Sequence, residues 1–533
     1  MGIYLNPGKR LFEMSLNSEI YVDKTGMIAY TNKVLCSEQR YICVSRPRRF
    51  GKSMAANMLA AYYDKSCDSG ELFANLKIAQ DKSYEKHKNQ YNVIRINMQE
   101  FLSEGNGIDE MLTLVERRIL FELKREYKDC TLFDENNLKF SMQDIFSQEQ
   151  TPFIILIDEW DCIFREYRED KEAQEKYLDF LRNWLKDKDY VALAYMTGIL
   201  PIKKYGTHSA LNMFQEFSMT NPGVLAEYVG FTADEVKQLG EKYGMDYEET
   251  RSWYNGYHFP QAPEIYSPKS VVDAMLSGQY DNYWNRTETY EALRRYIELN
   301  FDGLKETVIQ MLAGSRKKIN TGKFANDMTT FESADDVLTL LIHLGYLAYD
   351  SKKEEVYIPN KEISREFYNA VEGAGWQEVA RAIRSSWDLL ENVWRLETDK
   401  VAAGIEQAHY ETSVLQYNDE NALSYTISLA LYAAREYYTV IRELPTGKGY
   451  ADIVYIPRKK YADKPALIVE LKWNMAAEGA IAQIKKRQYV KALEEYTGNL
   501  LLVGINYNKE KKEHSCVIER VEMLGRINAD NVL

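Results

Sequence analysis

The chain has 533 residues, of which 45% are hydrophobic, 28% charged and 13% aromatic, and its formal net charge is −13. This length exceeds what one hydrophobic core usually organises, and the composition excludes a disordered chain. The negative balance opposes binding to nucleic acid through the overall field of the protein, so any such site must be local.

The cysteines and histidines indicate neither disulfides nor a zinc site. The six cysteines contain no CxxC pair, and the six histidines show no ligand spacing. The sequence also lacks any run of about 18 apolar residues, and its first residues lack the apolar segment of a signal peptide. We therefore expect a cytoplasmic protein that is not associated with a membrane.

Apolar runs alternate with helical patterns over residues 1–225. Four runs are typical of buried parallel strands: residues 40–45, 91–98, 151–160 and 191–198. Two intervening segments repeat apolar residues at spacings of three and four, as crossover helices do: residues 107–127 and 171–187. This pattern predicts an α/β domain with a parallel sheet.

The stretch SRPRRFGKSM (45–54) is similar to the phosphate-binding loop GxxxxGK[ST], with Arg46 in place of the first glycine. Gly51 would turn backbone amides toward phosphate, Lys52 would reach the β and γ oxygens, and the Ser53 hydroxyl would bind Mg²⁺. An apolar run precedes the loop and a helix-forming run follows it, in the order that such a loop requires. Three arginines form either a solvated basic turn or phosphate ligands, and we favour the second: Arg46, Arg48 and Arg49.

A second apolar strand, FIILIDEWD, ends in acidic residues, as a nucleotide site requires. Asp158 would hold the metal, and Glu159 would orient or deprotonate the attacking water. A third strand ends in Thr197, whose hydroxyl suits a sensor of the γ-phosphate. Because ligands of open α/β sheets bind at the carboxyl ends of the strands, all these groups are expected to meet there.

Residues 226–405 are mostly helix-like and form the second predicted domain. Within them, residues 334–360 give a helix, a stop at Gly345 and two short strands, which suggests a winged helix. This segment is either a DNA reader or a packing wedge between domains, and the acidic residues that flank it favour the wedge. No lysine or arginine occurs between Phe331 and Asp350, so we do not favour a DNA-binding transcription factor.

Residues 406–533 form the third predicted domain, with a long helix, a hairpin-like pair of strands, a helix and a final strand. Asp452 lies on the first strand, and Glu470 and Lys472 share one face of the next. Two carboxylates that bind Mg²⁺, with a lysine to steady the developing charge, are the groups of a metal-dependent phosphodiesterase. The alternative is an ordinary strand end with a surface salt bridge.

This arrangement resembles the PD-(D/E)XK nuclease superfamily, with Ala451 in place of the proline. The resemblance implies two supporting residues: Glu420 at the start of the upstream helix, for which Glu443 is a rival, and Gln483 in the helix that follows the core. Lysines near residues 459–464 and 485–491 form either a local basic surface or a solvated face.

The sequence also resembles the bacterial AAA-ATPase-like proteins that carry a C-terminal nuclease-like domain. The similarity covers nearly the whole chain and rests on five motifs: YVDKT (21–25), RPRRFGKS (46–53), LIDEWD (156–161), YNGYHF (254–259) and HLGYLAY (343–349). It implies that the arginine-rich loop is the normal form in this family. It also implies ATP as the ligand, bound by Lys52, Ser53, Asp158 and Glu159.

The function that we expect is therefore an ATP-binding and ATP-hydrolysing domain coupled to a Mg²⁺-dependent nuclease domain that acts on DNA, with RNA not excluded. The alternative is an ATP-regulated sensor or assembly module whose C-terminal domain binds nucleic acid or protein without cleaving it. A homo-oligomer is possible. An arginine finger that acts on the ATP site of a neighbouring subunit would require one.

Overall fold

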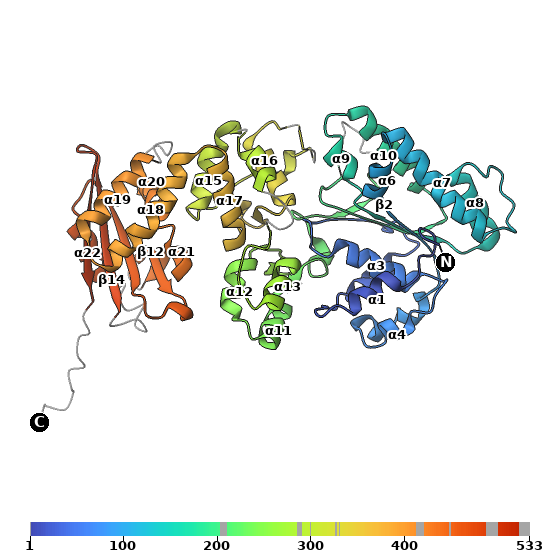
Figure 1. Ribbon diagram of the computed structural model, residues 1–533, viewed down its shortest axis with the longest axis horizontal. Coiled ribbons are helices and arrows are strands. Elements are labelled where there is room, and N and C mark those ends of the chain that lie inside the picture. Colours follow the sequence, from blue (N-terminus) through green and yellow to red (C-terminus); the bar gives the residue numbers. More distant parts are fainter. Residues whose placement is uncertain are drawn as a thin grey trace, which may run out of the picture. The chain divides into compact units, whose positions relative to one another are not determined.

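The computed structural model describes residues 2–202, 211–284, 290–298, 300–325, 328–329, 331–411, 420–446, 449–486 and 499–521. The chain forms two compact units (Figure 1). Unit 1 comprises Met1–Thr289 and Lys317–Arg365, and unit 2 comprises Tyr290–Arg316 and Glu366–Leu533. The division into three domains at residues 225/226 and 405/406 stays a prediction.

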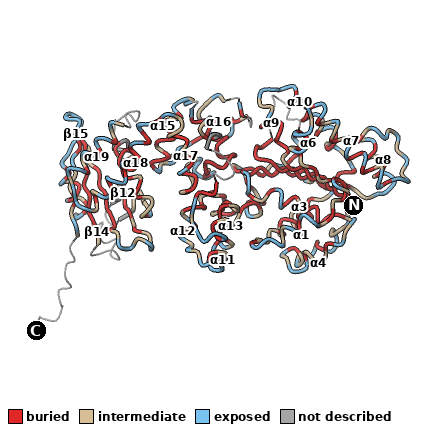
Figure 2. Tube along the Cα trace, in the orientation of Figure 1, coloured by how far each residue is buried: buried red, intermediate tan, exposed pale blue. Residues whose placement is uncertain are grey.

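A parallel five-stranded sheet lies at the centre of the N-terminal part of unit 1. Its strands are β1 (Tyr41–Ser45), β2 (Asn92–Asn97), β3 (Phe153–Asp158), β4 (Val191–Gly198) and β5 (Gln215–Phe217), in the order β2-β3-β4-β1-β5. Every residue of β1, β3 and β4 is buried, which explains their continuous apolar runs (Figure 2). The four predicted strands are confirmed, whereas the three-residue edge strand β5 was missed.

Helices cover this sheet. The principal ones are α1 (Arg10–Leu16), α2 (Gly26–Val34), α3 (Lys52–Tyr63), α6 (Met98–Glu104), α7 (Ile108–Glu126), α8 (Leu138–Glu149), α9 (Cys162–Glu166) and α10 (Lys171–Leu185). The predicted helices at residues 107–127 and 171–187 are α7 and α10. Asn137 and Asp170 cap the N-termini of α8 and α10 through their side chains, so these two helices begin where the sequence offers a cap.

The rest of unit 1 contains a small helical cluster and a winged-helix-like segment. The cluster consists of α11 (Ala233–Tyr243), α12 (Tyr247–Tyr254), α13 (Pro268–Ser277) and the strand pair β6 (Phe231–Thr232) and β7 (Ile265–Tyr266). The winged segment consists of β8 (Lys317–Lys318), α16 (Ala334–His343), β9 (Ala348–Asp350) and β10 (Glu355–Tyr357), with strand order β8-β10-β9. The predicted helix, glycine stop and strand pair are confirmed.

Unit 2 is built on a mixed five-stranded sheet in the order β11-β12-β13-β14-β15. The strands are β11 (Tyr438–Thr446), β12 (Gly449–Pro457), β13 (Ala466–Trp473), β14 (Leu500–Asn508) and β15 (Glu513–Arg520). Only the β13–β14 pair is parallel, and the helix α22 (Ala477–Lys486) lies in the connection between these two strands. The predicted α/β fold is confirmed.

The remaining helices of unit 2 are α14 (Tyr290–Glu298), α15 (Leu304–Leu312), α18 (Gln377–Trp394), α19 (Thr398–Glu411), α20 (Glu420–Ala430) and α21 (Ala434–Tyr437), while α17 (Lys361–Gly373) begins in unit 1. Arg442 of β11 donates to the carbonyl of Ala313 over 2.8 Å, at the C-terminal end of α15. A cation is favourable at the negative end of a helix, so this contact fixes α15 within unit 2.

Two sequence-based expectations for unit 2 were wrong. The single long helix expected near the start of this domain is interrupted: it is two helices, α20 and α21, and a strand begins at Tyr438. The single final strand is a pair, β14 and β15. No glycine or proline separates α21 from β11, so the helical pattern hid the change to the β-branched run Thr439-Val440-Ile441.

The two faces of this sheet carry different elements. Val454, Ile468 and Leu502 pack with Ile481 and Ile484 of α22. On the other face, Tyr507 contacts His409 of α19 at 5.3 Å between ring centroids, and Arg442 donates to Ser428 of α20. Side chains alternate between the faces of a strand, so each residue of β12 and β13 can be assigned to one of them.

Among the described residues, none of the helices has the length and apolar character that crossing a membrane requires.

Candidate functional sites

The glycine-poor loop lies between β1 and α3, as its sequence predicts. Gly51 has φ of +95°, and a Cβ atom there would meet no heavy atom within 4 Å. A left-handed backbone with open space beside it is what glycine allows and what a bound anion requires. Helix α3 begins immediately afterwards at Lys52, while Ser53 is exposed on its first turn. This end of α3 can therefore receive a phosphate group.

Lys52 is only 4% exposed and lies beneath the loop. Its Nζ donates to the carbonyls of Arg46 (3.0 Å) and Pro47 (2.9 Å). Burial lowers the pKa of Lys52, while the charges of Glu159, Asp161 and Asp158 oppose this shift. An ammonium group has three donors, so two bonds to the loop leave capacity for a phosphate oxygen.

The carboxyl ends of β3 and β4 bring Asp158 and Thr197 together. Both side chains are buried, and the Thr197 hydroxyl donates to Asp158 Oδ1. The backbone amide of Glu159 donates to the same oxygen over 3.1 Å. Val44 of β1 pairs with Thr197 of β4, so the loop and the acidic residues lie at the same edge of the sheet. The predicted juxtaposition is confirmed, whereas the roles of these residues stay predictions.

Glu159 is held in an ion pair that the sequence interpretation missed. Its carboxylate pairs with Arg165, whose Nε also lies 3.4 Å from Asp161 Oδ2. Burial raises the pKa of Glu159, and the charge of Arg165 lowers it. Asp161 in turn accepts from the amides of Ile199 (3.0 Å) and Leu200 (2.8 Å). The sequence could have indicated an ion pair of Arg165 through its spacing of four residues from Asp161, because residues at this spacing are neighbours on a helix.

The three loop arginines do not share one environment. Arg46 is fully buried, and its guanidinium donates to the carbonyls of Ser45 and Phe217, both over 2.9 Å. Burial lowers the pKa of Arg46 to about 10. In contrast, Arg48 and Arg49 are exposed and line a small cavity with Ser267, Lys269, Ser270, Tyr283 and Trp284. Arg46 thus joins β1 to the edge strand β5, and its expected phosphate contact stays a prediction.

The motifs YNGYHF and HLGYLAY pack against the loop. Phe50 makes an edge contact with Tyr257 at 5.3 Å, and the Tyr257 hydroxyl donates to the carbonyl of Gly345 over 2.6 Å. A Cβ atom on Gly345 would lie 2.7 Å from Pro47 Cγ and 2.7 Å from Trp284. The winged segment therefore contacts the loop directly and leaves room only for glycine.

A second cluster forms on the α22 face of the sheet in unit 2. The register Ile453–Val469, extended by one residue, places Asp452 opposite Glu470, and Asp452 Oδ2 accepts from the amide of Leu471 over 2.7 Å. Glu470 is 1% exposed, and its Oε1 accepts from Lys472 Nζ (3.2 Å) and from Gln483. The structure thus brings Glu470, Lys472 and Gln483 together and places Asp452 on the adjacent strand, while the roles of these residues stay predictions.

The upstream acid of this cluster is not settled. Helix α20 begins at Glu420, but the side chain of Glu420 lies outside the described residues. The helix that carries it packs on the face of the sheet opposite to Glu470. Glu443 is exposed and has φ of +52°, which interrupts the β11–β12 ladder. Either acid as a partner of Asp452 stays a prediction.

The donor atoms of this cluster fit Mg²⁺ in kind. Asp452 and Glu470 are carboxylates on facing strands, and hard divalent cations prefer oxygen ligands. Among the described residues, however, no group of three or more His, Cys, Asp or Glu side chains is placed to hold a metal ion. The remaining positions would be filled by water and by phosphate oxygens, as magnesium sites usually require.

Comparisons with known proteins agree with the two clusters. Residues 10–207 match the family model AAA-ATPase_like, described as "Predicted AAA-ATPase", and residues 420–516 match PDDEXK_9, described as "PD-(D/E)XK nuclease superfamily".

A curated relative, "Uncharacterized protein in vnfD 5'region" from Azotobacter chroococcum mcd 1, is 26% identical over 282 residues. The match covers 50% of this chain and 51% of the relative, so the chain spans about half the length of the curated relative that it matches.

Two archaeal structures are among those with some similarity. Cdc6p from Pyrobaculum aerophilum is 9% identical, with a TM-score of 0.24 and coverage of 67% of this chain and 97% of that one. The Aeropyrum pernix ORC2 protein is 10% identical, with a TM-score of 0.32 and coverage of 70% and 99%. These TM-scores do not establish a shared fold. On the family models, the chain carries an AAA-ATPase-like region at residues 10–207 and a region of the PD-(D/E)XK nuclease superfamily at residues 420–516.

Proposed function

We propose that this protein binds ATP with Mg²⁺ in unit 1, hydrolyses it, and cleaves DNA in a metal-dependent reaction in unit 2. The observation that carries the first half is the meeting of Lys52, Asp158 and Thr197 at the carboxyl edge of one parallel sheet. The observation that supports metal-dependent DNA cleavage is the position of Asp452 opposite Glu470, beside Lys472.

In unit 1 the residues divide into binding and positioning roles. Lys52 and the amides that follow Gly51 bind the phosphates, and Ser53 and Asp158 hold the metal ion. Thr197 orients Asp158 through its hydroxyl. Glu159 accepts the proton of the attacking water, which requires that its carboxylate is released from Arg165.

In unit 2 the chain supplies two carboxylates and one cation. Asp452 and Glu470 would hold the ion, and a bound Mg²⁺ would supply the polarisation of the phosphodiester and the activation of a water molecule. Lys472 stabilises the charge that develops on phosphate. Gln483 donates to Glu470 and so fixes the orientation of that carboxylate.

Two substitutions test the two halves separately. We expect Lys52→Ala to abolish ATP binding and turnover, and Asp452→Ala to abolish Mg²⁺-dependent DNA cleavage. Both variants lose hydrogen bonds of the folded chain, so their melting temperatures should fall, and circular dichroism verifies that they fold. Exposed charged residues provide matched controls: Lys176→Ala in unit 1 and Asp463→Ala in unit 2. Background cleavage that is unchanged in Asp452→Ala eliminates the nuclease, and the alternative of an ATP-regulated binding module then holds.

A further inference from the structure

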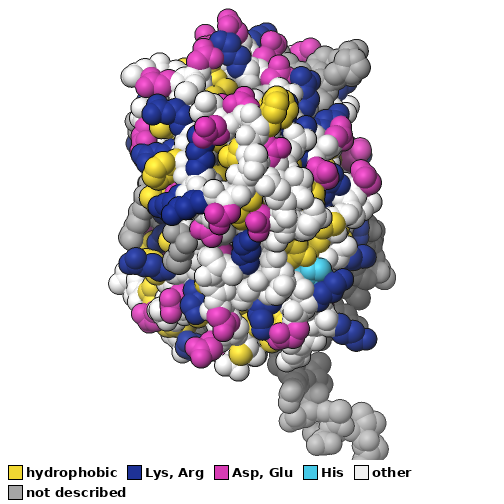
Figure 3. All heavy atoms as spheres, turned by 90° about the vertical axis from the view of Figure 1, so that its right-hand side faces the viewer, with side chains coloured by type: hydrophobic (Ala, Val, Ile, Leu, Met, Phe, Trp, Pro, Cys, Tyr) yellow, Lys and Arg dark blue, Asp and Glu magenta, His cyan; other side chains and the backbone are white. Residues whose placement is uncertain are grey.

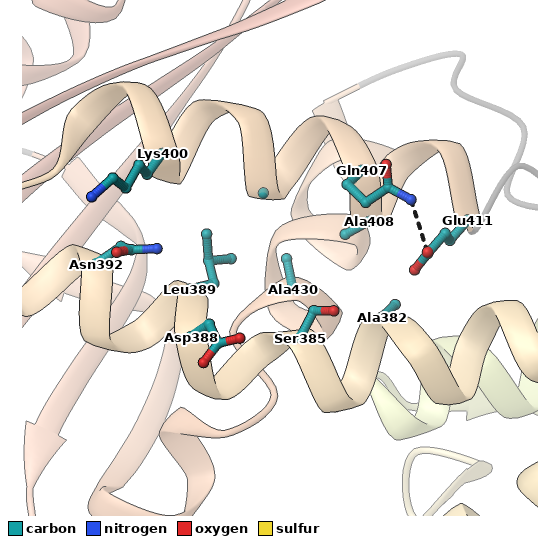
Figure 4. A pocket seen from close by; sticks show the side chains of 11 residues that line it. Ala382, Ser385, Asp388, Leu389, Asn392, Lys400, Gln407, Ala408, Glu411 and Ala430 are labelled. Carbon is teal, nitrogen blue, oxygen red and sulfur yellow. Dashed lines mark hydrogen bonds between the residues drawn. The ribbon is translucent and has the colours of Figure 1, made fainter.

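A pocket lined by both apolar and polar side chains lies among the helices of unit 2. It has a volume of about 220 Å³ and lies between α18 and α19, with Ala430 of α20 behind it (Figure 4). This is below the range of roughly 300–1,000 Å³ that is typical of pockets for drug-sized ligands, so the pocket suits a small metabolite rather than a nucleotide.

The inner end of this pocket contains a buried carboxylate that lacks half of its partners. The side chain of Glu411 is only 8% exposed. Its Oε1 accepts from Gln407 Nε2 over 2.8 Å and lies 3.3 Å from Arg381 Nε, whereas the buried Oε2 has no hydrogen-bond partner among the described residues. A buried acceptor that is left unsatisfied costs roughly 1–3 kcal/mol, and more when it is charged. A ligand with an N–H donor would remove this cost.

The floor of the pocket is apolar. It consists of Leu389 and three alanines: Ala382, Ala408 and Ala430. Gly404 lies beside Leu389, and a Cβ atom there would lie 2.6 Å from Leu389 Cδ1. Such a floor suits a short aliphatic chain, whose burial contributes about 0.8 kcal/mol for each methylene.

A second carboxylate, Asp388, lines the pocket further along α18, beyond Ser385 as seen from Glu411 (Figure 4). Lys400 lies at the far end with Asn392, and it is 63% exposed and 3.5 Å from Glu397. The charged side chains that line the pocket are therefore two carboxylates and one solvated ammonium, and the guanidinium of Arg381 pairs with one oxygen of the Glu411 carboxylate.

We propose that this pocket binds a small aliphatic diamine. One ammonium group donates to Glu411 Oε2, the methylene chain packs on the alanine floor, and the second ammonium group pairs with Asp388. This site is independent of the nucleotide and nuclease activities that we propose, and its test does not require either of them.

The test uses the full-length protein and isothermal titration with 1,4-diaminobutane, n-butylamine and butyrate. We expect saturable binding of 1,4-diaminobutane at one site, weaker binding of n-butylamine and none of butyrate. Glu411→Gln should weaken the diamine at least about tenfold, which corresponds to 1.4 kcal/mol. Asp388→Asn should reduce the diamine to the affinity of the monoamine.

The control is Glu391→Gln, which removes an exposed carboxylate of α18 that pairs with Arg395 at 2.9 Å. If Glu391→Gln and Glu411→Gln weaken binding equally, the attraction is that of the net charge and the proposal is wrong. Ala408→Leu fills the pocket and should abolish binding, while circular dichroism verifies its fold. Wild-type affinity in Ala408→Leu, or tighter binding of butyrate than of the diamine, also overturns the proposal.

Discussion

At the scale of single residues, burial decides what each charged group can do. Arg46 and Lys52 both belong to a loop rich in cations and both donate to backbone carbonyl groups, yet Lys52 is also influenced by the charges of three carboxylates. Likewise, Glu159 is placed to accept a proton and is paired with Arg165. The residues that hold the reacting groups therefore matter as much as the groups themselves.

Removal of Arg165 should shift the pH dependence of ATP hydrolysis. Glu159 accepts a proton only when ionised, so the rate falls as the pH drops through the pKa of Glu159. Burial raises this pKa and Arg165 lowers it. Arg165→Ala should therefore move the acidic limb of kcat to higher pH, and Arg165→Lys should restore much of it. An acidic limb in Arg165→Ala that matches the control Arg182→Ala, an exposed arginine, would rule out this role.

His514 should make unit 2 sensitive to acid. Burial lowers its pKa from 6.5 to about 4, and the nearby His409 contributes. The unfolded chain therefore binds a proton that the folded chain does not, so stability is lost as the pH falls from about 6.5 toward 4. Between pH 7 and pH 5 the loss is about 2 kcal/mol.

The measurement for His514 is urea unfolding at both pH values. His514→Phe retains an aromatic ring beside Tyr507; in the wild type the two ring centroids lie 4.8 Å apart. This variant should lose less of its free energy of unfolding between pH 7 and pH 5 than the wild type. His258, which is half-buried and lies in unit 1, supplies the control, because His258→Phe should leave the acid-induced loss of stability in unit 2 unchanged. An equal acid loss in His514→Phe and the wild type would contradict the proposed cause.

At the scale of elements, the loop between β1 and α3 is supported by segments far away in the sequence. Phe50 contacts Tyr257, and Pro47 contacts Gly345 of the winged segment. These contacts explain the motifs YNGYHF and HLGYLAY in structural terms. Both motifs support the loop for which we propose a role in phosphate binding. The winged segment thus acts as a packing element within unit 1, in line with the wedge interpretation.

Gly345→Ala should damage both stability and nucleotide affinity. A residue with a side chain in this left-handed conformation costs about 1–2 kcal/mol, and the Cβ atom would also force Pro47 to move. Gly244→Ala is the matched control, because Gly244 has φ of +68° and open space around it. We expect a lower melting temperature for both variants and weaker ATP binding only for Gly345→Ala. Equal ATP affinity in the two variants would show that the contact with Pro47 does not matter.

At the scale of the whole molecule, each unit has its own core and its own cluster of chemical groups. Val454, Ile468 and Ile484 belong to a core of unit 2, whereas Trp253, Tyr254 and Val271 belong to one of unit 1. The face shown in Figure 3 mixes basic and acidic side chains rather than gathering them by sign.

Nucleotide should therefore protect one unit from heat. A ligand at 100 times its Kd stabilises the unit that binds it by about 2.7 kcal/mol. In differential scanning calorimetry of the full chain, ATP with Mg²⁺ should raise the transition of unit 1, and Lys52→Ala should remove this shift. A similar shift in Lys52→Ala would place the nucleotide elsewhere.

The sequence by itself determined the elements and the candidate sites. Both sites are local patterns of apolar periodicity and residue spacing. The first is the strand, loop and helix around Lys52 with the apolar strand that ends in Asp158. The second is Asp452 followed by Glu470 and Lys472. Such patterns reflect short-range geometry, which the chain encodes directly. These patterns did not predict strand β5, which is short, or the start of strand β11, which follows a helix without a break.

Only the tertiary structure decided which charged groups are buried and which partners they meet. Four features depend on packing between separate elements. They are the burial of Arg46 under the loop, the contact of Gly345 with Pro47, the hydrogen bond from Gln483 to Glu470 and the half-satisfied carboxylate of Glu411. Packing density and desolvation are collective properties of a folded core, and no local window of sequence contains them.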